Sequence, residues 1–266
     1  MANQVWQRVR QEAEQAAQHE PMLASFFHAT ILTHDSLCKA LSYILAQKLG
    51  SGSVMAAVSL REIIQEALDQ DPQIITAVAK DMLAVVERDP AVDKLMTPLL
   101  YLKGFHALQA YRITHYLWQQ GRVDLAIFLQ NEISAVLGVD IHPAAQIGAG
   151  IMLDHATGIV IGETTAIADN VSILQGVTLG GTGKECGDRH PKIGAGVLIG
   201  AGAKILGNIS IGENAKIGAN SVVLKPVPPY CTAAGVPARI IGEDKCKCPA
   251  QEMDQNFLGI WEAMNI

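Results

Sequence analysis

The sequence predicts an α + β protein: an α-helical domain at residues 1–138, a parallel β-solenoid at residues 139–242 and a flexible tail at residues 243–266. Two periodicities support this prediction. Apolar residues recur every three or four positions in the first part and every six positions in the second. Both patterns are lost in the polar tail, so the two changes of pattern mark the expected boundaries.

Amphipathic segments fill the first domain. Aliphatic residues spaced by three and four positions share one face of a helix, which can pack onto a common core. Asp71-Pro72 and Asp89-Pro90 each read as an N-cap aspartate followed by proline at the first helical position. An all-α domain is therefore expected. Its clearest faces are Leu60, Ile63, Ile64, Ala67 and Leu68, then Ile75, Val78, Ala79, Met82, Leu83 and Val86, and finally Leu125, Phe128, Leu129, Ile133, Val136 and Leu137.

A six-residue repeat defines the second domain. One aliphatic residue in six would point inward, and a small residue after it would take the tight turn that joins two short strands. Three such repeats make one triangular coil, so this segment is long enough for about five coils. The aliphatic residues in phase are Ile141, Ile147, Leu153, Ile161, Ile167, Ile173, Leu179, Ile193, Ile199, Ile205, Ile211, Ile217 and Val223.

The repeat slips at two places. From Leu153 to Ile161 the step is eight residues instead of six, and from Leu179 to Ile193 it is two residues longer than two repeats. The second slip contains a polar stretch at 180–191 that we expect to project from the coil. Because interruptions of a strict repeat commonly carry function, candidate functional residues are sought there.

Composition narrows the class of protein. The chain has 266 residues, a net charge of −6 and 49% hydrophobic residues, so no broad basic face points to nucleic acid. No apolar run is long enough to cross a membrane, and the first residues lack the apolar core of a signal peptide. We therefore expect a cytoplasmic protein with no membrane partner. The five cysteines show no regular spacing, which favours reduced thiols and no metal site.

Specific motifs accompany the two periodicities. They are DPA at 89–91, LLYLKGFHALQAYR at 99–112, DIHP at 140–143, LDHATG at 153–158, GGTG at 180–183 and DRHP at 188–191. With these motifs the chain resembles the serine acetyltransferase family along nearly its whole length, whereas the repeat alone resembles only the wider group of β-helix acyltransferases. The resemblance implies a left-handed coil. It also implies transfer of the acetyl group of acetyl-CoA to the hydroxyl of L-serine, which yields O-acetyl-L-serine and CoA as the first step of cysteine biosynthesis.

His155, at the first slip, is the expected general base. A serine hydroxyl is protonated at neutral pH, so a base must take its proton as attack begins, and histidine suits this role. Asp140 lies nearly one coil earlier and is expected to orient the imidazole and stabilise its charged form. Because no enzyme nucleophile is needed, we expect direct attack in a ternary complex.

Serine is a zwitterion, so its site needs both signs of charge. Arg189 and His190 are candidates for the carboxylate, since an arginine fork matches its shape. Asp89 and Asp154 are candidates for the ammonium group. The resemblance implies that these four residues line the serine pocket. It also implies feedback inhibition by L-cysteine, which has sulfur in place of the serine oxygen and the same charged groups.

Acetyl-CoA is expected in the groove between neighbouring coils. Gly181, Ala201 and Ala219 would offer backbone contacts to its pantetheine arm, and Lys216 would offer a charge to its phosphates. The donor to the developing oxyanion is expected to be a backbone amide near Gly181.

The resemblance also implies an assembly. Coils would form trimers with active sites between subunits, and the helical domains would join two trimers into a homo-hexamer. The terminal Ile266 would insert into O-acetylserine sulfhydrylase, although Asn265 stands where most relatives carry glycine.

Other interpretations stay open at this point. His155, Arg189 and Lys216 could be solvated turn residues, and the solenoid could be a scaffold without catalysis. The chain could acetylate another hydroxyl acceptor, although such relatives generally lack a long helical domain. A zinc hydratase on the same fold could use His142, His155 and His190, but its usual pair of histidines five positions apart is missing from the solenoid.

Overall fold

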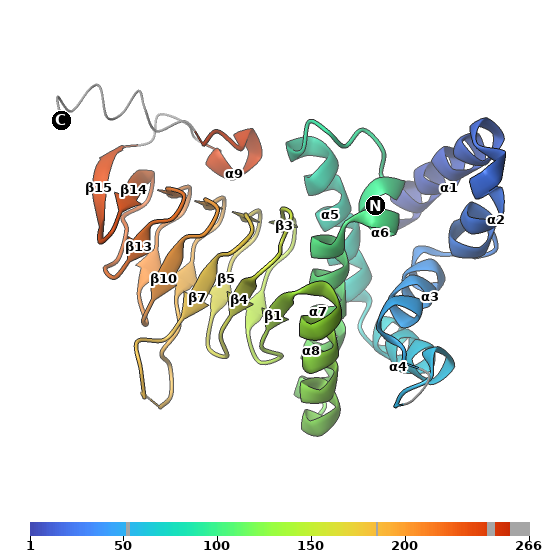
Figure 1. Ribbon diagram of the computed structural model, residues 1–266, viewed down its shortest axis with the longest axis horizontal. Coiled ribbons are helices and arrows are strands. Elements are labelled where there is room, and N and C mark those ends of the chain that lie inside the picture. The colour runs from blue at the N-terminus through green and yellow to red at the C-terminus, as the bar shows by residue number, and fades with distance from the viewer. Residues whose placement is uncertain (52–53, 185, 244–247, 256–266) are drawn as a thin grey trace.

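The computed structural model describes residues 1–51, 54–184, 186–243 and 248–255. Helices occupy one end of the molecule and a parallel β-solenoid occupies the other, as Figure 1 shows. The predicted fold class is confirmed. Within the described ranges, no helix is long and apolar enough to cross a membrane.

The three helical faces predicted from sequence lie on α4, α5 and α8, which confirms the helices, although Leu83 and Val136 of the predicted faces are exposed. The helical elements, in chain order, are α1 (Ala2–His19), η1 (Pro21–Leu23), α2 (Ala24–Phe27), η2 (His28–Leu32), α3 (Leu37–Leu49), α4 (Ala57–Gln70), α5 (Pro72–Arg88), α6 (Met96–Tyr101), α7 (Lys103–Gln119) and α8 (Val123–Leu137).

The two Asp-Pro pairs behave differently. Asp71 caps α5, and its carboxylate accepts a hydrogen bond of 2.9 Å from the backbone N–H of Gln73. Asp89 instead follows the last residue of α5, so the predicted helix start after it is wrong. Its carboxylate still accepts from the backbone N–H of Ala91 at 2.9 Å, because aspartate favours this bond in a turn as well as at a helix start. Asp89 is thereby held at the end of α5.

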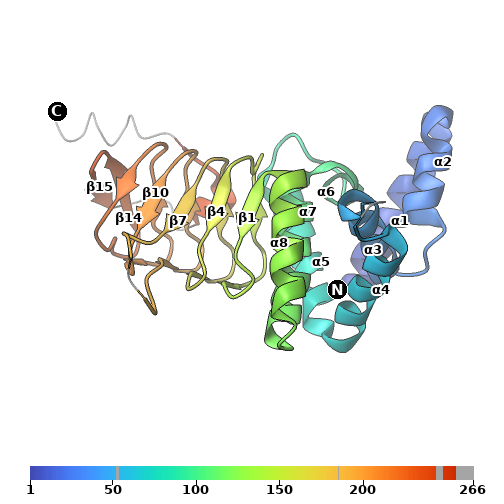
Figure 2. The same ribbon diagram turned by 60° about the horizontal axis from the view of Figure 1, so that its bottom comes forward.

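The solenoid has three parallel faces, here called sheets 1, 2 and 3, wound in about five coils (Figure 2). Sheet 1 contains β1 (Val139–Ile141), β4 (Ile159–Ile161), β7 (Thr178–Gly180), β10 (Lys204–Leu206) and β13 (Val222–Val223). Sheet 2 contains β2 (Gln146–Ile147), β5 (Ala166–Ile167), β8 (Lys192–Ile193) and β11 (Ser210–Ile211). Sheet 3 contains β3 (Met152–Leu153), β6 (Ser172–Ile173), β9 (Leu198–Ile199), β12 (Lys216–Ile217), β14 (Cys231–Gly235) and the antiparallel β15 (Ala238–Glu243).

The residues predicted at period six form the inside of the coil. All of them are buried except Ile147, which is half-buried but still packs against the core. Tight spacing between coils explains the small residues that follow them. A Cβ on Gly200 would lie only 2.6 Å from the backbone nitrogen of Ala219 in the next coil.

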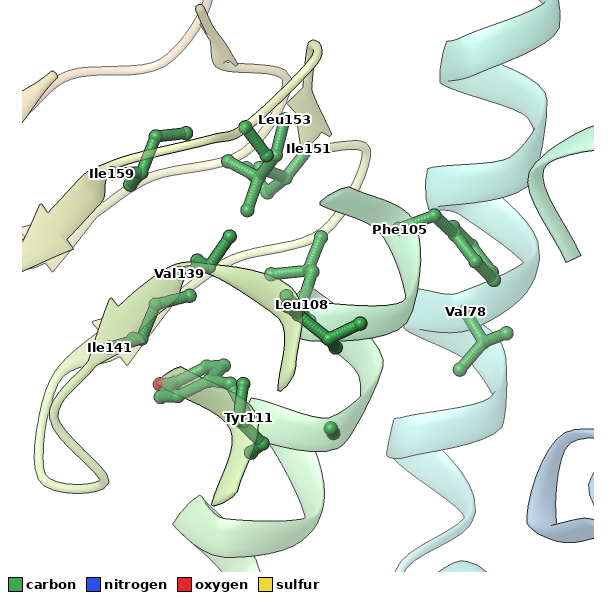
Figure 3. Close-up of a cluster of buried hydrophobic side chains, with 14 of the residues drawn as sticks. Val78, Phe105, Leu108, Tyr111, Val139, Ile141, Ile151, Leu153 and Ile159 are labelled. Atoms are coloured by element: carbon green, nitrogen blue, oxygen red, sulfur yellow. The ribbon is translucent and has the colours of Figure 1, made fainter. Parts of the chain in front are cut away.

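Helix α7 joins the two parts of the molecule. Figure 3 shows Leu108 of α7 beside Val139 of the first coil and Phe105 of α7 beside Val78 of α5, and all four belong to one continuous core. A buried ion pair lies at the same junction.

That ion pair links α5 to α7 and to the first coil. The Asp81 carboxylate lies 2.7 Å from Nη2 of Arg112, and its other oxygen accepts from the backbone N–H of Ile151 at 2.9 Å. Burial raises the pKa of Asp81, and the neighbouring charge of Arg112 opposes that rise. The positive charge of Arg112 therefore stabilises the buried negative charge of Asp81.

Replacing Arg112 by methionine is expected to destabilise the fold. It leaves the fully buried Asp81 without its counter-charge, which costs about 3–5 kcal/mol in free energy of unfolding. Denaturant unfolding of the full-length protein measures this. The matched control is Arg122→Met, which breaks the exposed Arg122–Glu66 pair and should change stability little. Equal effects of the two substitutions would contradict the structural role of the buried pair.

Residues 248–255, part of the predicted flexible tail, are folded in this structure. They contain α9 (Pro249–Glu252), which lies beside α5 and sheet 3 (Figure 1). Ala250 is buried, and its carbonyl accepts from the hydroxyl of Ser172 at 2.8 Å. The sequence shows no periodicity here because one short helical turn is held by tertiary contacts. Ile266 lies outside the described residues.

Candidate active site

The first slip lies beside the end of α5. There a cavity of about 280 Å³ is lined by Asp89, Asp154 and His155, together with the first turn of α7. Asp89 comes from the helical domain, whereas Asp154 and His155 come from the turn between β3 and β4. Three of the predicted site residues therefore meet at one cavity, at the corner where the chain passes from sheet 3 to sheet 1 (corner 3/1).

His155 projects from this corner toward solvent, with its side chain 75% exposed. Its Nε2 lies 3.8 Å from a carboxylate oxygen of Asp154. The backbone at His155 has φ of 55°, in the left-handed region, and Ala156 follows with φ of 63°. The exposed imidazole is accessible to an incoming substrate, as a general base must be.

Asp154 is more buried than its neighbour. Burial raises the pKa of its carboxyl group above the ordinary value; the nearby His155 lowers it and the negative Asp89 raises it further. A buried carboxylate with a second carboxylate at the same cavity forms a good site for a cation. The ammonium group of an amino acid has the required charge.

Asp140 is hydrogen-bonded to Gln130 and not to His155 in this structure. Its Oδ1 accepts from Nε2 of Gln130 at 2.7 Å, and it lies on sheet 1 beside Val160 of the next coil. Within the described part of the chain, no hydrogen bond joins Asp140 to His155. The expected hydrogen bond between the base and its orienting carboxylate is therefore not formed in this structure.

Arg189 and His190 lie at a second place, the corner where the chain passes from sheet 1 to sheet 2 (corner 1/2). Nη2 of Arg189 donates to the Glu163 carboxylate at 2.6 Å, and Nη1 donates to the carbonyl of Gly187 at 3.0 Å. These bonds hold the guanidinium at the base of the projecting segment that follows β7, which Figure 1 shows leaving the coil.

Thr164 determines which ring nitrogen of His190 carries the proton. Its hydroxyl accepts from the backbone N–H groups of Arg189 and His190, and its own backbone N–H donates to Nδ1 of His190 at 3.2 Å. Burial lowers the pKa of His190, and the charge of Arg189 lowers it further, so the neutral ring is favoured. Since Nδ1 accepts, the ring proton is assigned to Nε2. His190 is thus a neutral hydrogen-bond donor.

The two groups of site residues lie along opposite edges of sheet 1. The group at corner 3/1 follows β3, whereas Arg189 and His190 precede β8 at corner 1/2. One chain therefore does not bring Arg189 or His190 to His155.

The predicted acetyl-CoA residues are also divided between the corners. Ala201 and Ala219 lie at corner 3/1, two and three coils beyond His155, and Gly181 lies at corner 1/2. Lys216 is only 2% exposed, and its Nζ lies 3.4 Å from the Asp254 carboxylate. The predicted solvent-facing position of Lys216 is thus covered by residues 248–255.

Several residues that build the site were not found from sequence. Thr164 and Glu163 hold Arg189 and His190, and Gly162 leaves room for the imidazole, since a Cβ there would lie 2.1 Å from the ring. Lys103 and Gly104 line the cavity at corner 3/1. From the sequence, Gly162 could be recognised only as a small residue of the repeat. The roles of Glu163 and Thr164 become recognisable once β4 is known to pair with β7.

The three histidines considered for zinc lie at two corners. His142 and His190 are at corner 1/2, whereas His155 is at corner 3/1. Nδ1 of His142 accepts from the backbone N–H of Ala144 at 3.1 Å, and its ring packs edge-on against Trp118. In the ranges that the structure describes, no group of three or more His, Cys, Asp or Glu residues is arranged to hold a metal ion.

Comparison with known proteins decides the family. The model of the serine acetyltransferase N-terminal domain matches residues 5–110, and the model of the bacterial transferase hexapeptide matches residues 190–225. The serine acetyltransferase of Haemophilus influenzae is 65% identical over 266 residues, which cover 100% of this chain and 99% of that protein. This chain belongs to the serine acetyltransferase family. It is therefore an acyltransferase, as the motifs at the two slips predicted.

Solved structures of the family match the whole architecture. A serine acetyltransferase in complex with cysteine has a TM-score of 0.95 and 66% identity, covering 97% of this chain and 100% of that one. One in complex with CoA has a TM-score of 0.87 and 67% identity, covering 90% and 100%. The Neisseria gonorrhoeae enzyme in complex with serine has a TM-score of 0.86 and 59% identity, covering 88% and 96%.

Proposed function

We propose that this protein transfers the acetyl group of acetyl-CoA to the hydroxyl of L-serine and releases O-acetyl-L-serine and CoA. The observation that carries the proposal is the cavity at corner 3/1, where two carboxylates and an exposed histidine meet. Family members solved with CoA and with serine support the same pair of substrates.

In the proposed reaction, His155 takes the proton from the serine hydroxyl while its oxygen attacks the thioester carbonyl carbon. The tetrahedral intermediate collapses by breaking the carbon–sulfur bond, and the protonated imidazole returns the proton to the leaving CoA sulfur. Asp140 orients the charged imidazole in the assembled site, exchanging its bond with Gln130 for one with His155. No acyl-enzyme is formed.

Serine is proposed to bind through both of its charges. Asp89 and Asp154 take the ammonium group. Burial and the nearby Asp89 raise the pKa of Asp154, and a bound ammonium group would stabilise its charged form. Arg189 and His190 take the carboxylate through the guanidinium fork and Nε2–H. Since these two residues lie at the other edge of sheet 1, we propose that they come from a second copy of the chain, in a trimer with sites between subunits.

Acetyl-CoA is proposed to lie along corner 3/1. Ala201 and Ala219 follow the same corner as His155, so the thioester can reach the base while the pantetheine arm runs along the coils. Gly181 of a neighbouring copy would supply the opposite wall and a nearby amide the oxyanion donor. Lys216 can reach a phosphate only when residues 248–255 leave it.

L-Cysteine is proposed to inhibit by occupying the serine pocket, in line with the family member solved with cysteine. Its ammonium and carboxylate groups have the same spacing as those of serine.

We also propose that two trimers form a homo-hexamer and that Ile266 binds to O-acetylserine sulfhydrylase. Deleting the last ten residues should abolish that complex, and unchanged binding would refute the role of the tail.

The raised pKa of Asp154 predicts how inhibition by L-cysteine depends on pH. A protonated carboxyl cannot pair with an ammonium group, so inhibition by L-cysteine should weaken as pH falls toward the raised pKa, at a higher pH than an ordinary aspartate would give. Asp154→Asn should remove this weakening of inhibition at low pH. It should also weaken inhibition by about tenfold at neutral pH. Inhibition constants measured across pH test it. If inhibition of the variant still weakens at low pH as in the wild type, the titrating group is not Asp154.

The release of CoA with a panel of acceptors tests the proposed function. L-Serine should support rapid release, whereas sugars and other amino acids should support little. Equal rates with all hydroxyl acceptors would contradict the assignment of the substrate.

A further inference from the structure

The turn that carries His155 has an unusual backbone. His155 and Ala156 both have positive φ, of 55° and 63°, although each carries a Cβ. The left-handed region is unfavourable for such residues, and two in succession persist only where the surroundings hold them. The position of the proposed base therefore depends on what packs around residues 154–158.

The solenoid holds one side of this turn. The backbone N–H of Gly158 donates to the carbonyl of Gly138 at 2.7 Å, and the carbonyl of Thr157 accepts from Gly176 at 2.8 Å. Ala156 is fully buried in the core. At the beginning of the turn, the backbone N–H of Asp154 donates to the carbonyl of Ile173 in the next coil at 2.8 Å.

Helix α7 holds the other side. Nζ of Lys103 donates to the hydroxyl of Thr157, and Gly104 lies directly on the carbonyl of Leu153. A Cβ on Gly104 would lie 2.2 Å from that carbonyl oxygen and 2.9 Å from Cβ of Ala156. Because the first of these neighbours is backbone, no side-chain rotation could relieve the clash.

Glycine at this position is not explained by the helix itself. Gly104 lies in the first turn of α7, where alanine is the more favourable residue. Glycine at this position allows the close approach to β3, and Figure 3 shows Leu108, one turn further along α7, on the side that faces the first coil.

We infer that Lys103 and Gly104 are positioning residues for the proposed general base. Together they fix the turn at residues 154–158 against α7, so that His155 and Asp154 face the same cavity as Asp89. The helical domain thus sets the geometry of the acetyl-transfer site as well as supplying Asp89. This inference rests on the proposed function, since it depends on the role of His155.

Gly104→Ala in the full-length chain tests the inference. The added methyl group should move the turn, and kcat for acetyl transfer to L-serine should fall by about tenfold to a hundredfold because a small displacement of a base is costly. The KM for acetyl-CoA, which binds along the later coils, should stay nearly unchanged. A crystal structure of the variant should show residues 154–158 displaced. An unmoved turn, or an unchanged kcat, would overturn the inference.

Gly121→Ala is the matched control. Gly121 follows α7, has φ of 75° and has no atom within 4 Å of an added Cβ. Alanine there should strain the helical domain and lower its melting temperature without moving the turn, so kcat should be unchanged. A fall in kcat equal to that of Gly104→Ala would show that general destabilisation, not positioning, is responsible.

A second pair of variants keeps the test decisive if Gly104→Ala fails to fold. Thr157 is exposed, so Thr157→Val should fold, lose the bond from Lys103 and lower kcat by about threefold to tenfold. Thr157→Ser, which keeps the hydroxyl, should restore kcat; equal kcat for the two variants would overturn the role of Lys103. The wild-type chain is assayed alongside: its failure to acetylate L-serine would refute the proposed function itself, whereas an active wild type with unaffected variants refutes only the positioning.

Discussion

Replacing His155 by alanine is expected to lower kcat for acetyl transfer to L-serine by about 10²–10⁴-fold, the contribution typical of a general base. His155 is the exposed imidazole at the cavity that also holds Asp89 and Asp154. Removing it leaves the two carboxylates in place, so L-cysteine should still bind. The loss should therefore appear in kcat and not in the inhibition constant.

Steady-state assays of the release of CoA measure this effect. His28→Ala is a suitable control, because His28 is exposed in the helical domain and does not line the cavity. Asp140→Asn should also lower kcat, because the orienting carboxylate is lost, while Gln130 keeps a partner of the same shape. Full activity of the His155→Ala enzyme would remove the assignment of the base.

A mixture of two inactive variants is expected to recover activity. In the proposed trimer each site uses His155 of one copy and Arg189 of the next, since the two residues lie at opposite edges of sheet 1. An oligomer of either variant alone lacks one of these two residues at every site. In a randomly mixed oligomer of both, roughly one quarter of the sites combine an intact His155 with an intact Arg189.

Co-expression of the two variants with different tags, followed by purification through both tags, provides the mixed oligomer. Its activity at saturating serine should approach a quarter of the wild-type value. A useful control joins both substitutions in one chain and mixes it with either single variant, which recreates no intact site. Activity no higher than the mean of the separate variants would contradict a site shared between copies.

The repeat was predictable because it depends on local geometry. Every sixth residue must point inward, so residues such as Ile161, Ile199 and Ile217 could be placed in the core from their spacing alone. The two slips were visible for the same reason. They identified His155 and Arg189 as candidates, although only the pairing of strands shows that these residues lie at different corners.

Features that depend on tertiary contacts escaped prediction. Asp89-Pro90 has the local preference of a helix start, but α5 ends there and the aspartate caps a turn. Lys216 occupies an outward position of the repeat, yet it is covered because Asp254 folds back onto it. The support of His190 by Thr164 joins residues far apart in sequence, and no spacing rule reveals it.

The central claim is that serine attacks acetyl-CoA directly, with His155 as the base. A single-turnover measurement of the release of CoA, with enzyme in excess over acetyl-CoA, tests it most directly. Without serine, no CoA should be released; on addition of L-serine, one equivalent of CoA and one of O-acetyl-L-serine should appear together, and the His155→Ala enzyme should be slow in the same step. A rapid release of CoA without serine, which would reveal an acyl-enzyme, would contradict the account.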